Sequence, residues 1–358
     1  MAHLDLSQDA ARLTAALVDI ESVSGDEREI ADAVEAALRP FDHLEVVRIG
    51  ESVIARTRLG RRDRVVVAGH LDTVPIADNF PSRLEDGVLY GIGTADMKGG
   101  VAVGLRLAAY VPEPTLDVTY VFYECEEVEA ERNGLKLITD ERPELLAADF
   151  AVLMEPTSAE VEGGCQGTMR VEVATTGVRA HAARGWMGAN AIHAAAPILD
   201  RLVAYEPRQP DVDGLRFRES LNAVGIIGGV AGNVIPDRCV VTVNHRFAPD
   251  RDEGAAYEFL KDFFAGFEVT LMDSAPGARP GLDLPAAASF VAAVGGEPGP
   301  KLGWTDVARF AELGIAAVNF GPGNPNVAHA RHEHVAVTEI QQCEDKMRAW
   351  LTGIIRVS

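Results

Sequence analysis

The stretch RVVVAGHLDTVP, residues 64–75, guides the interpretation of the whole sequence. Its apolar residues 65–68 indicate a strand that is buried on both faces of a sheet. Side chains alternate along a strand, so His70 and Asp72 point to the same side, one behind the other. With this spacing a carboxylate can hold one nitrogen of an imidazole while the other nitrogen faces a ligand. The plain alternative for this stretch alone is a strand that ends in a polar turn.

The segments around this stretch alternate between helix and strand patterns. Helices are predicted at 7–20, 26–40 and 97–111, and strands at 44–49, 52–59, 117–127 and 149–155. Ser7 is the expected N-cap of the first helix, and Pro40 is expected to end the second. Near-continuous apolar strands separated by helices favour an α/β domain with a mostly parallel sheet.

The pattern changes after about residue 165. Strands are predicted at 168–177, 221–230, 238–247 and 267–273, and helices at 190–205 and 252–266. This β-α-β-β-α-β order is that of a ferredoxin-like α+β unit. The Pro- and Gly-rich segment 274–285 then marks the return to the first domain. We therefore expect a catalytic domain formed by 1–166 and 278–358, interrupted by an inserted lid or dimerisation domain at 167–277.

Composition and charge exclude several classes of partner. The chain has 358 residues, of which 47% are hydrophobic and 24% charged, and its formal charge is −21 from 33 basic and 54 acidic residues. Such a charge disfavours binding to nucleic acid or to an anionic membrane. No apolar run reaches the length of about 18 residues that a transmembrane helix needs. The acidic, amphipathic start MAHLDLSQDAARL is unlike a signal peptide, and four scattered cysteines without a CxxC pair favour a cytoplasmic protein.

Ionisable side chains recur where the predicted strands end. They are His70 and Asp72, Asp96 at a helix entry, Glu126 and Glu127, Glu155, and His329 in a late loop. Ligand sites in open α/β sheets form at the carboxyl ends of strands, so we expect these groups to meet. Two histidines with carboxylates and no thiolate suit a catalytic zinc ion. The carboxylates are too many for one ion, and two ions that share Asp96 would explain the excess and would suit amide hydrolysis.

Several motifs resemble those of a known family. GHLDTVP, GIGTADMKGG, ECEE, LMEPT, GVRAHAARGWMGANAIH and NVIPDRCVVTVNHRF are similar to motifs of the zinc-dependent aminoacylase and carboxypeptidase family of dimetal hydrolases. The similarity covers nearly the whole chain, with the motifs in the family's order. YECEEVEAERNGL, VEGGCQGTMR and GWTDVARF favour the desuccinylase branch, in its form from high-GC Gram-positive bacteria.

The resemblance implies a role for each residue of the candidate site. One metal ion would be held by His70, Asp96 and Glu155, and the other by Asp96, Glu127 and His329. Zinc is the expected metal, with cobalt or manganese as alternatives. Asp72 would orient His70, and Glu126 would be the general base. The family also implies a cis peptide bond between Asp96 and Met97.

The resemblance further implies a homodimer that forms through the inserted domain. His181 would cross to the partner subunit and donate a hydrogen bond to the tetrahedral oxyanion, whereas without the resemblance it is a turn histidine with a local hydrogen bond. Arg246, Asn233 and Thr305 are the candidates for substrate binding. The segment GGCQGT departs from the pattern, because better-known desuccinylases carry paired arginines where this chain has Cys165 and Gln166.

Each motif also has a structural alternative. In ECEEVEAE, Glu129 and Glu131 are expected on a solvated face, and the role of Glu124 is open. His332 and His334 are rivals of His329 as ligands. GIGTAD lacks the third glycine of a dinucleotide-binding loop, so a nucleotide-dependent oxidoreductase is disfavoured.

The resemblance implies hydrolysis of the amide bond of N-succinyl-LL-2,6-diaminopimelate to succinate and LL-2,6-diaminopimelate by a metal-bridged hydroxide. The alternatives are a related deacylase, such as one that acts on N-acetylornithine, and a catalytically silent metal-binding homologue. The presence of Glu126 argues against the silent homologue, because loss of the base is the simplest way to lose hydrolysis.

Overall fold

The computed structural model describes residues 3–354, which form two compact units. Unit 1 comprises 3–163, 280–299 and 309–354, and unit 2 comprises 164–279 and 300–308. Residues 300–308, which the sequence analysis places with the first domain, group with unit 2. Within residues 3–354, no helix is both long enough and apolar enough to cross a membrane.

Unit 1 is built on an eight-stranded sheet with the order β1-β2-β6-β3-β7-β18-β8-β17. Its strands are β1 (Glu45–Ile49), β2 (Ser52–Arg56), β3 (Arg64–His70), β6 (Asp117–Tyr123), β7 (Phe150–Leu153), β8 (Glu162–Gly163), β17 (Gly299–Pro300) and β18 (Ala316–Asn319). The central strands β6, β3, β7 and β18 are parallel. A smaller sheet contains β4 (Arg83–Glu85), β5 (Val88–Tyr90) and β19 (His334–Ala336). The predicted α/β class with a mostly parallel sheet is confirmed.

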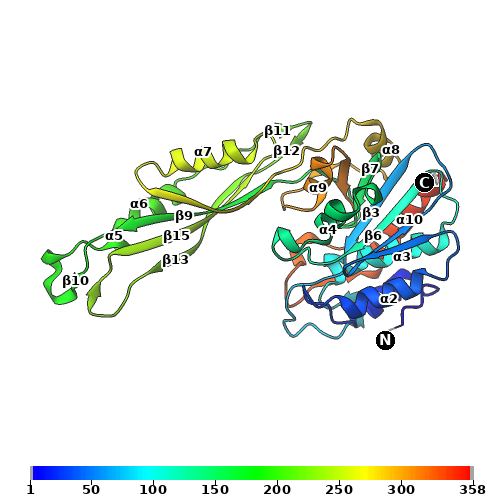
Figure 1. Cartoon of the computed structure of the whole chain (residues 1–358), viewed down its shortest axis with the longest axis horizontal. Coiled ribbons are helices and arrows are strands. Elements are labelled where there is room, and N and C mark those ends of the chain that lie inside the picture. Colours follow the sequence, from blue (N-terminus) through cyan, green and yellow to red (C-terminus); the bar gives the residue numbers. More distant parts are fainter. Residues whose placement is uncertain (1–2, 355–358) are drawn as a thin grey trace. The chain divides into compact units, whose positions relative to one another are not determined.

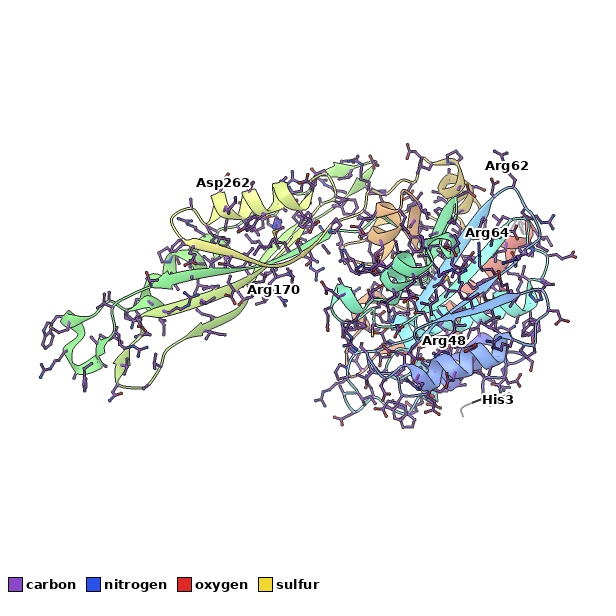
Figure 2. The ribbon with its side chains drawn as sticks, in the orientation of Figure 1. His3, Arg48, Arg62, Arg64, Arg170 and Asp262 are labelled. Carbon is purple, nitrogen blue, oxygen red and sulfur yellow. The ribbon has the colours of Figure 1, made fainter. Side chains whose placement is uncertain are left out.

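The central strands are buried along nearly their whole length because helices cover the sheet. Every residue of β6 and β7 is buried, as the continuous apolar runs predict. The helices are α1 (Ala10–Val18), α2 (Arg28–Leu38), α3 (Gly99–Tyr110), α4 (Gly134–Glu141), α8 (Pro285–Val294), α9 (Val307–Glu312) and α10 (Val337–Thr352). In Figure 1, α2 and α3 lie side by side, and α3 also packs against α1, α10, β3 and β6. Arg48 on β1, which Figure 2 labels, forms an ion pair with Glu35 on α2 at 3.1 Å.

Unit 2 has its own antiparallel sheet with the order β13-β15-β9-β16. Its strands are β9 (Gly167–Thr176), β13 (Ser220–Gly228), β15 (Arg238–Phe247) and β16 (Glu268–Ala275), with short ribbons β10 (Ala180–His181) with β14 (Val234–Ile235) and β11 (Asp211–Val212) with β12 (Leu215–Arg216). Its helices are α5 (Ala191–Ala194), α6 (Ala196–Val203) and α7 (Glu253–Phe263). Arg170 on β9, which Figure 2 labels, forms an ion pair with Asp273 on β16. The main elements follow the predicted β-α-β-β-α-β order of a ferredoxin-like unit.

Two local expectations need correction. Ser7 does not cap α1, because its amide and hydroxyl both donate to Asp5; Asp9 is the N-cap and accepts from the amide of Arg12 at 2.9 Å. The predicted helix 190–205 is divided into α5 and α6. Pro197 sits at the start of α6, where it has no amide hydrogen to continue the helical ladder.

Candidate metal centre

The strands β3, β6 and β7 bring their carboxyl ends to one edge of the sheet of unit 1. In the parallel ladders His70 lies opposite Tyr123, and Ala68 lies opposite Leu153. The amide of Met154 donates to Ala68 O at 2.8 Å, so continuing this register places Glu155 level with His70. The residues that follow these strands therefore gather at the edge where α/β sheets form their ligand sites.

His70 is held in one orientation by its neighbours. Its Nδ1 lies 3.0 Å from the main-chain oxygen and 3.4 Å from Oδ1 of Asp72, and its Nε2 lies 3.1 Å from Oδ1 of Asp96. The ring is 1% exposed and Asp72 is fully buried. A neutral ring that donates through Nδ1 presents the lone pair of Nε2, which is the arrangement of a metal-binding histidine.

Asp96 lies in the short helical turn η1 (Thr94–Lys98), between β5 and α3. Its peptide bond with Met97 is cis, which confirms the expectation from the sequence. The amides of Ala95 and Asp96 both donate to Oε1 of Glu333, each at 3.0 Å. A residue far away in the sequence, Glu333, therefore fixes the backbone at Asp96.

Glu127 and His329 complete the cluster. His329 Nε2 lies 2.8 Å from Glu127 Oε1 and 3.4 Å from Asp96 Oδ2. His329 has a φ of 61°, in the left-handed region that few non-glycine residues adopt. The loop that follows β18 thus brings a histidine against two carboxylates from distant segments.

This donor set fits divalent metal ions. His70, Asp96 and Glu127 each offer one ligand atom, and these atoms lie within 4.8 Å of one another. His329 contacts two of the three, and Glu155 is buried at the adjacent strand end. Within residues 3–354, Glu155 is outside that tight group of three. Imidazoles and carboxylates without thiolate ligands are the donors of catalytic rather than structural zinc sites.

The histidines and Asp96 shift one another's pKa. Burial alone would lower the pKa of His70, but hydrogen bonds and charges of Asp72 and Asp96 raise it well above its usual value. Hydrogen bonds to Asp96 and Glu127 raise the pKa of His329 to about 10. Burial would raise the pKa of Asp96, yet His329 and His70 lower it. The cluster is therefore a place where positive charge is strongly stabilised.

Asp72 has a second contact surface besides His70. Its Oδ1 accepts from the amide of Glu126 at 3.0 Å, and its Oδ2 accepts from the amide of Glu127 at 3.1 Å. Ser24 Oγ also donates to Oδ2 at 2.7 Å. One buried carboxylate thus orients both the predicted metal ligand His70 and the turn that carries the predicted base.

The remaining predicted site residues lie in unit 2. His181 pairs with Val234 in the ribbon β10–β14, and the amide of Ala182 donates to the main-chain oxygen of Asn233 at 2.8 Å. The structure therefore brings His181 and Asn233 together. His181 Nδ1 accepts from the amide of Ala183 at 3.0 Å, so the neutral ring carries its proton on Nε2.

Arg246 and Thr305 lie in another part of unit 2. Arg246 is near the end of β15 opposite Thr168, and burial lowers its pKa. Cys165 Sγ donates to the main-chain oxygen of Thr305 at 3.6 Å. Gln166, at the position of the missing paired arginines, is buried and donates to the main-chain oxygen of Arg218 at 2.7 Å.

The rival candidates have other partners. His334 lies on β19 with its ring 5.3 Å from that of Tyr90, and its Nδ1 is 2.7 Å from the main-chain oxygen of His332. Glu124 is half-buried and accepts from the amide of Glu51 at 2.7 Å. Glu129 and Glu131 are exposed, as expected for a solvated face.

Three residues that support the cluster escaped the sequence analysis. Glu333 holds the backbone of Asp96, Ser24 holds Asp72, and Lys98 is buried with its Nζ donating to Ile20 O at 2.9 Å. Burial lowers the pKa of Lys98 to about 7, against the charges of Glu333 and Asp72. Lys98 directly follows Met97 within the motif GIGTADMKGG, so this motif was the signal from which its role near the cluster could have been predicted. Ser24 and Glu333 carry no comparable local signal.

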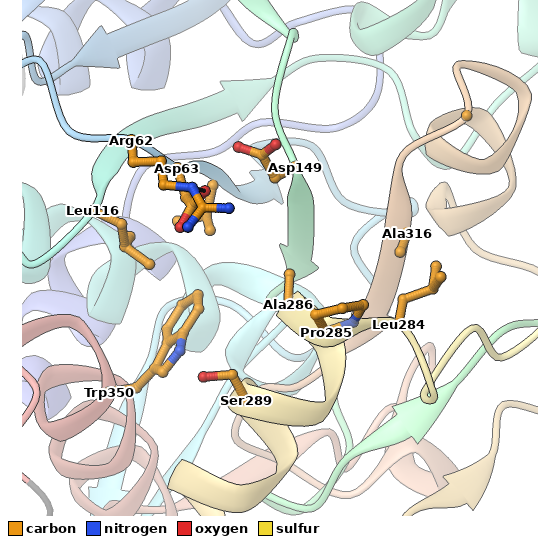
Figure 3. Close-up of a pocket in the computed structure, with 12 residues that line it drawn as sticks. Arg62, Asp63, Leu116, Asp149, Leu284, Pro285, Ala286, Ser289, Ala316 and Trp350 are labelled. Atoms are coloured by element: carbon orange, nitrogen blue, oxygen red, sulfur yellow. Dashed lines mark ion pairs between the residues drawn. The ribbon is translucent and has the colours of Figure 1, made fainter.

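A cavity of about 510 Å³ lies elsewhere in unit 1 (Figure 3). Its lining includes Asp63, Asp149, Ser289 and Trp350. Asp63 precedes β3 and Asp149 precedes β7, so this cavity is at the amino ends of the strands. The donor cluster is at their carboxyl ends, where chemistry is expected in such sheets.

Comparisons with known proteins identify the family. The model of peptidase family M20/M25/M40 matches residues 66–352. The chain belongs to this family. It is 54% identical over 98% of its length to the whole of a Mycobacterium tuberculosis protein provisionally named succinyl-diaminopimelate desuccinylase DapE. It is 47% identical to the succinyl-diaminopimelate desuccinylase of Corynebacterium glutamicum, over 98% of each chain.

The fold is shared with solved structures. A tripeptidase from Staphylococcus aureus aligns over 99% of each chain, with a TM-score of 0.78 and 20% identity. At that identity the likeness concerns the fold alone. Membership of M20/M25/M40 makes this chain a metal-dependent hydrolase, as the resemblance implied.

Proposed function

We propose that this M20 member hydrolyses the amide bond of N-succinyl-LL-2,6-diaminopimelate to succinate and LL-2,6-diaminopimelate. The observation that carries the chemistry is the convergence of His70, Asp96 and Glu127, with His329 against the two carboxylates. The substrate is supported by relatives named for this activity that match along the whole chain. An N-acetylornithine deacetylase is the competing assignment.

Two divalent cations, zinc in the first place and cobalt or manganese as alternatives, belong to this proposal. His70, Asp96 and Glu155 would hold one ion, and Asp96, Glu127 and His329 would hold the other. When bound, such ions polarise an amide carbonyl and lower the pKa of a coordinated water. Two imidazoles and three carboxylates form the donor set that this chemistry needs.

Glu126 acts as the general base in the proposed reaction. Its carboxylate takes a proton from the attacking water and passes it to the amide nitrogen that leaves. Asp72 supports this role because it accepts from the amide of Glu126 while its other contacts orient His70. One group therefore aligns base and ligand together.

His181 stabilises the oxyanion from the partner subunit. Its Nδ1 is occupied by the amide of Ala183, which leaves Nε2–H as the donor. Such a donor contributes about 3 kcal/mol to transition-state stabilisation. Asn233, held beside His181, and Arg246 and Thr305 are proposed to bind substrate.

A second copy of this chain is proposed to bind at the exposed edge of strand β13. This strand lies at the edge of its sheet, with Ile226 and Ile227 exposed by 53% and 76%, and Val203 at the end of α6 is 89% exposed. An apolar, unprotected strand edge favours pairing with another strand. Pairing of β13 with its copy about a two-fold axis would extend the sheet across a homodimer.

We place the reaction in the cytoplasm. All four cysteines are free and buried, which suits a reducing compartment.

The assignment is tested by comparing substrates on the purified protein. We expect kcat/KM for N-succinyl-LL-2,6-diaminopimelate to exceed that for N-acetylornithine by orders of magnitude, because each enzyme selects through its transition-state contacts. A preference for N-acetylornithine would replace the assignment, and zinc binding without hydrolysis of either substrate would support a silent homologue.

A further inference from the structure

A short segment of unit 1 forms hydrogen bonds with the residues that follow strands β3 and β6. Residues 22–27 lie between α1 and α2 and run alongside residues 71–73, which follow β3. Ser22 Oγ donates to Leu71 O at 2.7 Å. The amide of Thr73 donates to the main-chain oxygen of Ser22 at 2.9 Å, and the amide of Ser24 donates to the main-chain oxygen of Thr73 at 3.1 Å. Ser24 Oγ adds its bond to Asp72. This segment is therefore fixed to the strand end that carries His70.

Glu27, at the end of this segment, reaches the other strand end. It is 1% exposed, and its Oε1 accepts from the amide of Gly25 at 2.8 Å. The same oxygen accepts from the amide of Cys125 at 3.2 Å and from its Sγ at 3.3 Å. The Cys125 thiol therefore donates to the carboxylate of Glu27.

The turn after β6 is thus held at three successive amides. Glu27 accepts from the amide of Cys125, and Asp72 accepts from the amides of Glu126 and Glu127. Cys125 has a φ of 55°, a left-handed conformation that non-glycine residues adopt where their surroundings enforce it. The backbone conformation just before the base therefore depends on the buried Glu27 carboxylate.

We propose that Glu27 is a positioning residue that fixes the turn 125–127, and through it the carboxylates of Glu126 and Glu127. The proposal rests on the proposed function, because it assumes that Glu126 is the base and Glu127 is a metal ligand. Glu27 is not among the proposed metal ligands or the proposed substrate-binding residues. Its effect passes through the backbone of Cys125.

The test compares Glu27→Ala with Glu27→Gln, because glutamine keeps an acceptor oxygen where alanine keeps none. Glu29→Ala is the matched control, since it removes an exposed carboxylate from the first turn of the same helix α2. For each protein we would measure kcat and KM, the affinity for Zn²⁺ by competition with a chelator, and the folded fraction by circular dichroism.

We expect Glu27→Ala to lose about 10- to 100-fold in kcat and to bind one zinc ion more weakly, the usual effect of losing a group that orients a ligand. KM stays near the wild-type value, Glu27→Gln recovers most of the kcat, and Glu29→Ala matches wild type. Wild-type kcat and zinc affinity in folded Glu27→Ala would overturn the proposal, as would equal losses in the Ala and Gln variants.

The zinc measurement separates this proposal from the assignment of the substrate. If the wild-type protein hydrolyses no succinylated substrate, the assignment fails. A weaker zinc affinity of Glu27→Ala relative to Glu27→Gln would still support the positioning role.

Discussion

Asp72 contacts several parts of the candidate site at once. It is fully buried, lies 3.4 Å from the ring of His70 and accepts hydrogen bonds from Ser24, Glu126 and Glu127. A buried carboxylate is stable only when its lone pairs are satisfied, and here each satisfied lone pair also orients part of the site. Stability and function therefore depend on the same atoms.

For Glu126, the proposed general base, we predict that Glu126→Gln lowers kcat by about 10²- to 10⁴-fold, because glutamine cannot accept the proton. The substitution leaves the amide bond to Asp72 in place, so the protein should fold and bind zinc as wild type does. Steady-state kinetics with zinc analysis checks both parts. Undiminished kcat in this variant would remove Glu126 from the role of base.

The sequence indicated the residues that converge in the candidate cluster better than the residues that support them. His70, Asp72 and Glu127 lie at strand ends, and the alternation and register of strands make such positions readable. Glu333 accepts from the amide of Asp96 and Glu27 accepts from the amide of Cys125, and neither glutamate follows a strand that the sequence predicts. Glu27 in particular belongs to a run of charges, which is the pattern of a solvated helix start.

At the scale of elements, β15 carries a buried histidine with an unusual environment. His245 is fully buried, its ring lies 5.2 Å from Phe259 and 5.7 Å from Phe247, and within the described chain neither ring nitrogen has a hydrogen-bond partner. Burial lowers its pKa from 6.5 to about 4, although the charge of Glu219 opposes this shift. The ring is therefore neutral in the folded protein near neutral pH.

This environment predicts a loss of stability in mild acid. The unfolded chain protonates His245 below pH 6.5 while the folded chain resists protonation down to about pH 4. Stability is thus complete above pH 6.5 and falls as the pH drops through this window, by about 2 kcal/mol at pH 5. Urea unfolding of wild type and His245→Leu at pH 7.5 and pH 5 measures the effect. Equal acid sensitivity of the two proteins would contradict it.

Element types were predictable where apolar runs are nearly continuous, as in β3, β6 and β7. The ends of helices were less predictable. Asp9 rather than Ser7 caps α1 because Ser7 bonds to Asp5, a choice between neighbouring caps that local sequence does not decide. The break between α5 and α6 was readable from Pro197, yet a helix pattern spans it.

At the scale of the whole molecule, the exposed edge of β13 predicts how activity depends on assembly. Ile227→Lys places a charge on this edge, so we expect a monomer by light scattering. Activity should fall by about 10²-fold or more, because His181 would no longer reach a partner. Met272→Lys on the opposite edge strand β16 is the control and should remain dimeric and active. A dimeric, active Ile227→Lys protein would place the interface elsewhere.

The central claim is that side chains from strand ends, a turn and a loop of one chain hold two cations that the hydrolysis needs. The most direct measurement strips the protein of metal and follows the hydrolysis of N-succinyl-LL-2,6-diaminopimelate during titration with Zn²⁺. The account predicts no turnover at the start and full activity at two equivalents per chain, with none restored in a His70→Ala, His329→Ala double variant. Full turnover by the metal-free protein, or wild-type activity in the double variant, would contradict it.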